Sequence, residues 1–178
     1  MTFELQPHLR GTLVELRPLR ADDFAPLHAV ASDPLIWAQH PHSDRYQEPV
    51  FREFFREAIE SRGALLALDA RDGRVIGSSR YHGYDERRRE IEIGWTFLAR
   101  SHWGGAYNGE MKRLMLAHAF RFVERVKFVI GANNLRSRRA IERIGASLAG
   151  SMPDLGRGPM VVYAIDAAAF AARATPSS

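Results

Sequence analysis

The stretch Phe97-Leu-Ala-Arg-Ser-His-Trp-Gly-Gly-Ala-Tyr-Asn108 predicts a strand that ends in a turn and continues directly into a long helix. The turn contains Gly104 and Gly105, which allow the backbone to approach a ligand closely. The residues that follow are strongly helical in pattern up to about Val126. Such a turn exposes backbone N–H groups at a helix N-terminus, where the partial positive charge favours phosphate. A turn of this kind can also serve only to cap and pack a helix.

The spacing of the glycines narrows the ligand class. It matches neither the G-x-x-x-x-G-K-[ST] of nucleoside-triphosphate-binding loops nor the G-x-G-x-x-G of dinucleotide-binding folds. The strand before the turn alternates in polarity from Glu90 to Leu98, which is typical of a strand with one buried face. Its other face carries the carboxylates Glu90 and Glu92. We expect the apolar face to consist of Ile91, Ile93, Trp95 and Phe97.

Strands and helices alternate along the rest of the chain. Strands are expected at Thr12–Leu19, Ala64–Asp69, Arg74–Tyr81, Phe128–Ala132 and Pro159–Ile165, and helices at Phe24–Val30, Val50–Arg62 and Asn134–Ile144. The segment from Leu35 to Glu48 has no period and is expected to be a long loop. Residues 171–178 are expected to be a frayed end. This order predicts a single α/β (or α+β) domain over residues 1–178, with a mixed sheet and helices on both of its faces.

Composition excludes several classes of protein. The chain has 178 residues, 46% apolar and 26% charged, as expected of one soluble globular domain. No apolar run approaches the roughly 18 residues needed to span a bilayer, and the N-terminus lacks the pattern of a signal peptide, so a cytoplasmic location without membrane contact is expected. The absence of cysteine excludes disulfides, thiolate metal ligands and an acyl-cysteine intermediate. Direct transfer of a group between substrates is therefore favoured.

Charge and histidines give weaker signals. The net charge is +4, but the arginines are spread along the chain and no groove-reading module accompanies them, so we do not expect nucleic-acid binding as the main function. Binding of an anionic cofactor explains a positive net charge equally well. The histidines lack metal-ligand spacing, so no metal is expected. His118 lies on the apolar face of the long helix and is expected to be a core residue.

Two segments resemble motifs of the GNAT superfamily of N-acetyltransferases, especially its RimJ/RimL-like branch. In that family the turn carries [QR]-x-x-G-x-[GA] and grips the pyrophosphate of coenzyme A (CoA). Here Ser101-His-Trp-Gly104-Gly-Ala106 fits, except that Ser101 replaces the first Gln or Arg. The second segment, Asn134-Leu-Arg-Ser137-Arg-Arg-Ala-Ile-Glu-Arg-Ile-Gly-Ala146, resembles the family's helix beside the thioester.

The resemblance implies a mostly antiparallel GNAT sheet, acetyl-CoA as cosubstrate and a homodimer. It implies that Asn134 points at the pantetheine arm, although Asn is also a good helix cap. Ser137 is implied to face the leaving sulfur. Many relatives place a Tyr general acid where Ile141 stands, so the acid role falls to Ser137 or to water. The implied CoA-binding residues are Phe97, Leu98, Ala99, Trp103, Gly104, Gly105, Ala106, Tyr107, Asn108 and Asn134.

Acyl transfer to an amine also needs a base, because a free amine with a pKa of about 10 is mostly protonated near neutrality. Glu92 or Glu90 can accept that proton, directly or through a water. Glu92 is preferred because the family often places a carboxylate immediately before Ile93-Gly94. Either carboxylate could instead face solvent and pair with residues 87–89. The developing oxyanion is expected to meet a backbone N–H from residues 97–99.

The sequence therefore predicts an enzyme that acetylates a primary amine, on a small molecule or a peptide N-terminus. Trp37, Tyr46, Tyr81 and Tyr84 could line the acceptor pocket, although large aromatic residues more often serve packing. The alternative is a module on the same fold that binds CoA or nucleic acid without turnover, which the residue at Ile141 and the basic charge suggest. A fold alone does not decide between these functions.

Overall fold

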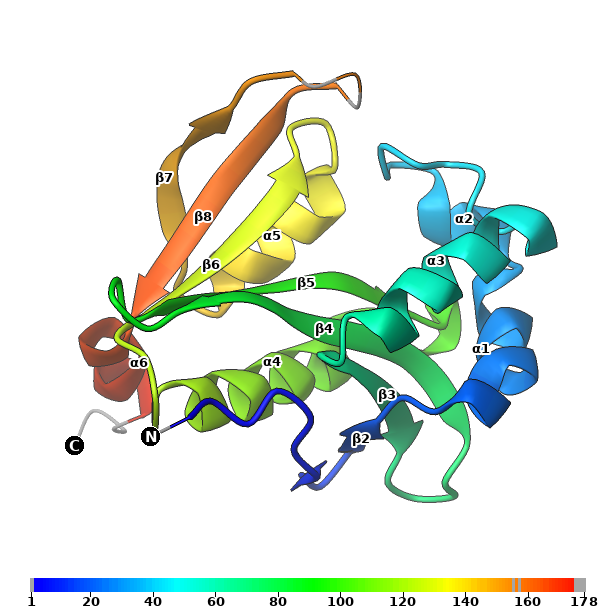
Figure 1. The fold of residues 1–178 in the computed structure, drawn as a ribbon, viewed down its shortest axis with the longest axis horizontal. Coiled ribbons are helices and arrows are strands. Elements are labelled where there is room, and N and C mark those ends of the chain that lie inside the picture. Colours follow the sequence, from blue (N-terminus) through cyan, green and yellow to red (C-terminus); the bar gives the residue numbers. More distant parts are fainter. Residues whose placement is uncertain (1, 155, 157, 175–178) are drawn as a thin grey trace.

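An eight-stranded sheet with the order β1-β2-β3-β4-β5-β6-β8-β7 forms the centre of the molecule (Figure 1). The computed structural model describes residues 2–154, 156 and 158–174. Every neighbouring pair of strands is antiparallel except β5 and β6. The expected mixed, mostly antiparallel α/β class is confirmed. The strands are β1 Leu9–Arg10, β2 Val14–Pro18, β3 Ala64–Asp69, β4 Val75–Asp85, β5 Glu90–Leu98, β6 Arg125–Gly131, β7 Ser147–Met152 and β8 Met160–Asp166.

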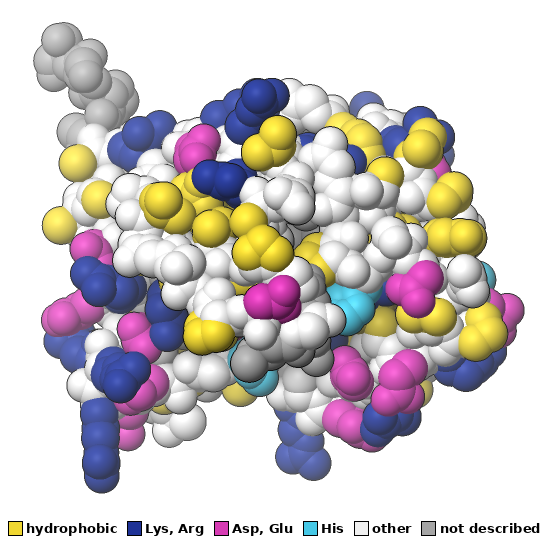
Figure 2. Space-filling view, turned by 90° about the horizontal axis from the view of Figure 1, so that it is seen from above, with side chains coloured by type: hydrophobic (Ala, Val, Ile, Leu, Met, Phe, Trp, Pro, Cys, Tyr) yellow, Lys and Arg dark blue, Asp and Glu magenta, His cyan; other side chains and the backbone are white. Residues whose placement is uncertain are grey.

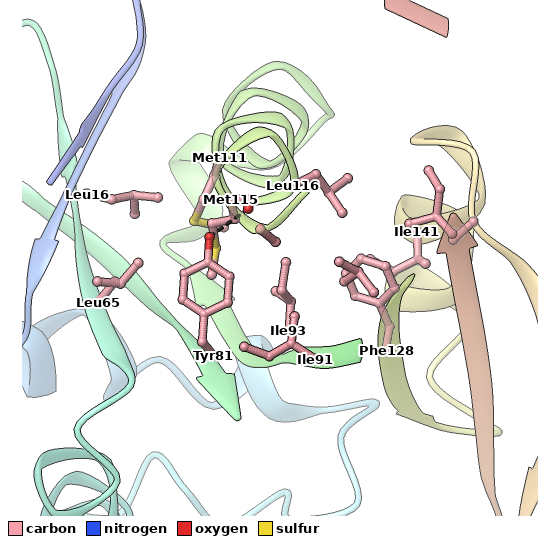
Figure 3. Packing of buried hydrophobic residues seen from close by; sticks show 14 of the residues in the cluster. Leu16, Leu65, Tyr81, Ile91, Ile93, Met111, Met115, Leu116, Phe128 and Ile141 are labelled. Carbon is pink, nitrogen blue, oxygen red and sulfur yellow. Dashed lines mark hydrogen bonds between the residues drawn. The ribbon is translucent and has the colours of Figure 1, made fainter. Parts of the chain in front are cut away.

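Helices cover both faces of the sheet, as expected (Figure 1). The helices are α1 Phe24–Ala31, α2 Pro34–Trp37, α3 Glu48–Glu60, α4 Ala106–Ala119, α5 Leu135–Arg143 and α6 Ala167–Ala174. Helices α1 to α3 share a core cluster on one face, whereas α4 and α5 belong to a second cluster. In Figure 3, Met111 and Met115 of α4 point at Tyr81 and Ile93 of the sheet. This buried apolar contact fixes α4, and therefore its N-terminus, against β4 and β5.

A β-bulge in β5 overturns one expectation about its faces. The register with β4 shifts so that two residues of β5 oppose Ser79, and Trp95 adopts a φ of 51°. Before the bulge, Ile91 and Ile93 belong to the core under α4. After it, Trp95 and Phe97 pack with the core of α1 to α3. The prediction that all four share a face was wrong, because one extra residue reverses the alternation.

The parallel strands β5 and β6 stay together only over their first residues. Their register pairs run from Glu90↔Arg125 to Glu92↔Lys127. Beyond that point β5 follows β4, and β6 pairs with β8 as far as Gly131. The two strands therefore diverge into a V, which opens the middle of the sheet (Figure 1).

Two expected boundaries in the first two thirds of the chain were wrong. The expected loop after residue 34 begins with helix α2, because Pro34 occupies its first turn and the side chain of Asp33 accepts the N–H of Leu35 at 3.0 Å. Helix α4 ends at Ala119 instead of continuing to about residue 126. The chain turns there because the N–H groups of residues 124 and 125 bond to the carbonyl of Arg89 and start β6.

Two elements near the C-terminus were not foreseen. Strand β7 is exposed at all six positions, so its sequence shows no alternation between buried and exposed residues. Helix α6 includes residues 171–174, which were expected to fray. Residues 175–178 of that expected tail lie outside the described residues.

Glu110 of α4 anchors the turn between β1 and β2. Its carboxylate accepts the backbone N–H groups of Thr12, Leu13 and Val14 at 3.1, 2.6 and 2.8 Å. The substitution Glu110→Ala removes a charged acceptor from three donors, so we expect the free energy of unfolding to fall by about 2–3 kcal/mol in a urea titration. Glu53→Ala, which removes an exposed ion pair of α3, should lower the free energy of unfolding by less than about 1 kcal/mol. Equal losses in the two variants would contradict this role for Glu110.

Candidate active site

A cavity of about 450 Å³ lies in the V between β5 and β6. Its walls come from β5, β6, the turn before α4, the inner face of α5 and residues of the segment 36–45. Of the thirteen residues given a catalytic or CoA-binding role from the sequence, nine line the cavity, namely Glu92, Phe97, Leu98, Trp103, Gly104, Gly105, Asn108, Asn134 and Ser137. Four others do not line it, namely Glu90, Ala99, Ala106 and Tyr107.

The turn before α4 has the backbone that its sequence predicts. Gly104 and Gly105 adopt φ angles of 102° and 119°, a backbone region that residues other than glycine rarely adopt. A Cβ atom built on either residue would meet no atom within 4 Å, so the space over the turn is open. The first N–H groups of α4, a helix of 14 residues, begin at Ala106. Phosphate groups fit such a turn, because they can accept these N–H groups at the positive end of the helix dipole.

A buried carboxylate behind the turn holds it in place. Asp69, at the end of β3, accepts hydrogen bonds from Arg71 at 2.7 Å, from Nε2 of His102 at 3.2 Å and from the hydroxyl of Tyr107 at 3.2 Å. The guanidinium of Arg71 holds the pKa of Asp69 well below its usual range. Nδ1 of His102 in turn lies 2.8 Å from Oγ of Ser101. Tyr107, expected to bind CoA, therefore supports the turn from behind.

Arg136 joins three walls of the cavity. Its guanidinium lies 4.0 Å from the centre of the Trp103 ring and donates to the carbonyl of Ile36 at 2.7 Å. The Trp103 indole donates to the carbonyl of Leu98 at 2.9 Å. Helix α5, the turn and helix α2 are thereby fixed relative to one another. The sequence did not single out Arg136, because no local pattern marks this contact.

Two polar residues at the N-terminal end of α5 line the cavity. Asn134 is 5% exposed, and its side chain accepts the N–H of Ser137 at 3.2 Å. The capping role expected of Asn134 is thus confirmed. Ser137 lines the cavity from the first turn of the helix. Ile141 is buried beside Phe128 and provides no hydroxyl.

The two candidate carboxylates of β5 lie in different surroundings. Glu92 lines the cavity, and a Cβ on Gly94 would lie 3.1 Å from its Oε1. Burial raises the pKa of Glu92 to about 7, although the charges of Lys127 and Arg80 oppose the shift. Glu90 instead accepts a hydrogen bond from Nζ of Lys127 at 2.7 Å. The structure brings Glu92 into the cavity and leaves Glu90 outside it.

Lys112 of α4 lines the opposite side of the cavity and was not singled out by the sequence. It is 2% exposed, and its ammonium donates to Thr96 and, at 3.3 Å, to Oγ of Ser79. Burial lowers the pKa of Lys112 to about 7. A lysine on the apolar face of a helix was the signal that could have found it. Groups that titrate near neutrality therefore flank β5 on both sides.

Histidines contribute to the core and to the cavity wall. His118 is 4% exposed and its Nε2 lies 2.7 Å from the carbonyl of Glu4, so it is the core residue that was expected. His40, His42 and His82 line the cavity. Among the described residues, no group of three His, Cys, Asp or Glu side chains could hold a metal ion.

Comparison with known proteins shows which family has this architecture. A family model described as acetyltransferase (GNAT) domain matches residues 14–147. The chain belongs to the GNAT acetyltransferase family. A GCN5-related N-acetyltransferase from Brucella melitensis is 22% identical, with a TM-score of 0.82 over 94% of this chain and 81% of that one.

Two further solved structures share the fold of this GNAT domain. Mycobacterium smegmatis RimJ in complex with CoA-disulfide is 19% identical, with a TM-score of 0.69 over 97% of this chain and 90% of that one. Spermidine N-acetyltransferase from Vibrio cholerae, in complex with CoA and spermine, is 14% identical, with a TM-score of 0.69 over 90% of this chain and 99% of that one. Likeness at these identities shows the fold alone.

Acetyl-CoA is the cosubstrate of the GNAT family, and the open turn of this GNAT domain fits its phosphates. When bound, acetyl-CoA supplies an activated acetyl group as a thioester. In the part of the chain that the structure describes, no helix is both long and apolar enough to cross a bilayer.

Proposed function

We propose that this GNAT domain transfers the acetyl group of acetyl-CoA to a primary amine, on a small molecule or a peptide N-terminus, by direct attack. The observation that carries the proposal is Glu92, a carboxylate inside the cavity whose pKa is raised by burial to about 7. A general base works best when its pKa lies near the operating pH. Glu92 has that property at the point where β5 and β6 diverge.

We assign each step of the proposed reaction to a residue or to a water. Glu92 accepts the proton of the ammonium, directly or through a water, and the neutral nitrogen bonds to the thioester carbon. The carbon–sulfur bond then breaks, and the second proton that the nitrogen loses passes to the leaving thiolate through Ser137 or a water. Gly104, Gly105 and the first turn of α4 hold the pyrophosphate. Glu90 receives no role, because its carboxylate is bonded to Lys127.

The amine class is supported by one of the structures that share the fold, since spermidine N-acetyltransferase is named for an amine acceptor. A RimJ/RimL-like branch is supported in the same way, since another structure that shares the fold is named RimJ. An acetylation screen tests the proposal. Purified protein and acetyl-CoA are incubated with free amines, peptides and amine-bearing antibiotics, and products are read by mass spectrometry together with thiol release. Tight CoA binding without turnover of any amine would favour the CoA-sensing alternative instead.

CoA should stabilise the protein against heat. A ligand that binds only the folded state adds RT ln(1 + [L]/Kd), roughly 2.7 kcal/mol at a hundredfold excess over Kd. We expect a clear rise of the melting temperature in a thermal scan with millimolar CoA or acetyl-CoA. Adenosine, which lacks the pyrophosphate, should shift the transition much less. An unchanged transition with CoA would count against the assigned phosphate turn.

A further inference from the structure

The chain carries few side-chain amines. Of its 25 lysine and arginine residues, two are lysines, Lys112 and Lys127. Figure 2 looks onto the face that is uppermost in Figure 1 and shows basic side chains spread over it, with histidines near its middle. Arginine keeps its proton in proteins, so its guanidinium does not attack an acyl group. The two lysines are therefore the side-chain amines of this protein that can accept an acetyl group.

The two lysines lie in opposite surroundings. Lys127 of β6 has 32% of its side chain exposed, does not line the cavity and donates to Glu90 at 2.7 Å. Lys112 is 2% exposed, lines the cavity and contacts no carboxylate of the described residues. Burial without a counter-ion lowers the pKa of Lys112 to about 7, so about half of the molecules carry it as a neutral amine near pH 7.

Neutral groups hold the amine of Lys112 in place. Its Nζ donates to Thr96 and, at 3.3 Å, to Oγ of Ser79. The two hydroxyl oxygens lie 2.8 Å apart, and each lies 3.4 Å from the carbonyl oxygen of Gly94. A neutral amine has two hydrogens and one lone pair, and these hydroxyls accept both hydrogens. The lone pair is then left to form a bond.

One face of α4 leads from the phosphate turn to Lys112. Gly105, Asn108, Gly109 and Lys112 follow one another at intervals of three or one residues, share this face and all line the cavity. The two glycines add no side chain to it, so Lys112 carries its first long side chain, about 9 Å along the helix axis from Ala106. We expect an acetyl-CoA whose phosphates occupy the turn to extend the arm that ends in its thioester along this face, toward the amine.

We propose that Lys112 is a self-acetylation site, whose Nζ attacks the thioester of acetyl-CoA bound in the same cavity. This inference shares acetyl-CoA binding with the proposed function but needs no acceptor substrate. A bond forms between Nζ and the acetyl carbon, the carbon–sulfur bond breaks, and the proton that the nitrogen loses passes to the thiolate of CoA. The product is an amide, so the acetyl group stays on the protein, where it removes the charge of Lys112 and occupies part of the cavity.

Incubation of the purified protein with acetyl-CoA, without any acceptor, tests the inference. We expect the intact mass to rise by one acetyl group. Peptide mapping should find that group on Lys112 at least about tenfold more often than on Lys127, because a thioester bound beside an amine reacts as if within one molecule. Acetic anhydride, which needs no binding site, is the matched control reagent and should favour the exposed Lys127. Excess CoA should suppress acetylation of Lys112, since it occupies the same cavity.

Reaction within one molecule has a kinetic signature. The first-order rate constant should not depend on protein concentration, because a second molecule cannot reach a side chain that is 2% exposed. The mass increase should disappear in Lys112→Arg, whose fold is checked by circular dichroism. Lys127→Arg is the matched control; it keeps a cation beside Glu90 and should be acetylated on Lys112 at the wild-type rate.

Several results would overturn the inference, namely an unmodified protein, equal modification of the two lysines, acetylation that excess CoA does not suppress, or a rate constant that rises with protein concentration. Its failure is separable from failure of the proposed function. Acetylation of an added amine by a protein whose Lys112 stays unmodified would preserve the proposed function and refute self-acetylation. Acetylation of Lys112 without acetylation of any added amine would do the reverse.

Discussion

The substitution Glu92→Gln should lower turnover near neutral pH by about 10²- to 10⁴-fold, the contribution of a positioned acid–base group. It keeps the shape of the side chain and removes its ability to accept a proton, so CoA affinity should barely change. The measurements are kcat for the best acceptor and CoA affinity by calorimetry. Raising the pH toward the pKa of the amine should recover part of the rate, because more of the amine is then neutral.

The pH profile of the wild-type protein provides a second test of Glu92. Its activity should rise as pH increases through about 7, where this carboxyl group ionises, and this limb should be absent from Glu92→Gln. Glu90→Gln is the control on the same strand, and it should retain turnover because Glu90 lies outside the cavity, bonded to Lys127. Full activity in Glu92→Gln together with loss in Glu90→Gln would move the base to Glu90. Full activity in both would exclude a carboxylate base from β5.

The substitution Gly104→Val should weaken CoA binding by at least tenfold, which corresponds to about 1.4 kcal/mol. A β-branched residue strongly disfavours a φ of 102°, so the turn must change its backbone. The added side chain would also occupy the open space over the turn. Calorimetric titration with CoA measures the loss, and circular dichroism checks that the sheet is still folded.

Gly73→Val is the matched control for Gly104→Val. Gly73 has a φ of 73° in the β3–β4 turn, and a Cβ there would also meet no atom within 4 Å. The control introduces similar backbone strain but does not line the cavity. It should therefore reduce stability and leave CoA affinity unchanged. Equal losses of affinity in the two variants would mean that the turn at Gly104 is only structural.

The part of the site that local sequence determines was foreseen. The turn at Gly104 and the cap at Asn134 depend on backbone conformations that adjacent residues impose, so a short motif is enough to find them. Most strands and helices followed from periodicity for the same reason, whereas α2, β7 and α6 did not. The choice between Glu92 and Glu90 was not decidable, because both alternate onto one face of the same strand. It depends on Lys127, which reaches Glu90 from a neighbouring strand.

The features that the sequence did not reveal depend on contacts between distant residues. Asp69 supports the turn through His102, 33 positions later, and no local pattern links them. His40 and Arg45 line the cavity from a segment without periodicity, so no sequence pattern indicated that they lie there. The bulge at Trp95 escaped notice because alternation in composition continues through it, whereas the strand itself changes face.

The two buried ionisable groups on either side of β5 have a consequence for proton linkage. Glu92 has its pKa raised from 4.5 to about 7, so the stability it contributes is complete below pH 4.5 and is lost as pH rises through 7. Lys112 has its pKa lowered from 10.5 to about 7, so its contribution is complete above pH 10.5 and is lost as pH falls through 7. Their summed contribution has its minimum near pH 7.

Urea unfolding of the CoA-free protein across pH 5 to 9 should show this minimum as a trough. Glu92→Gln should remove the falling limb below pH 7, and Lys112→Met should remove the rising limb above it. A profile that keeps both limbs in both variants would show that other groups produce the trough. Near pH 7, where Glu92 can accept a proton, the burial of these two groups thus destabilises the free protein most. Each bound substrate that offsets this destabilisation also stabilises the folded state.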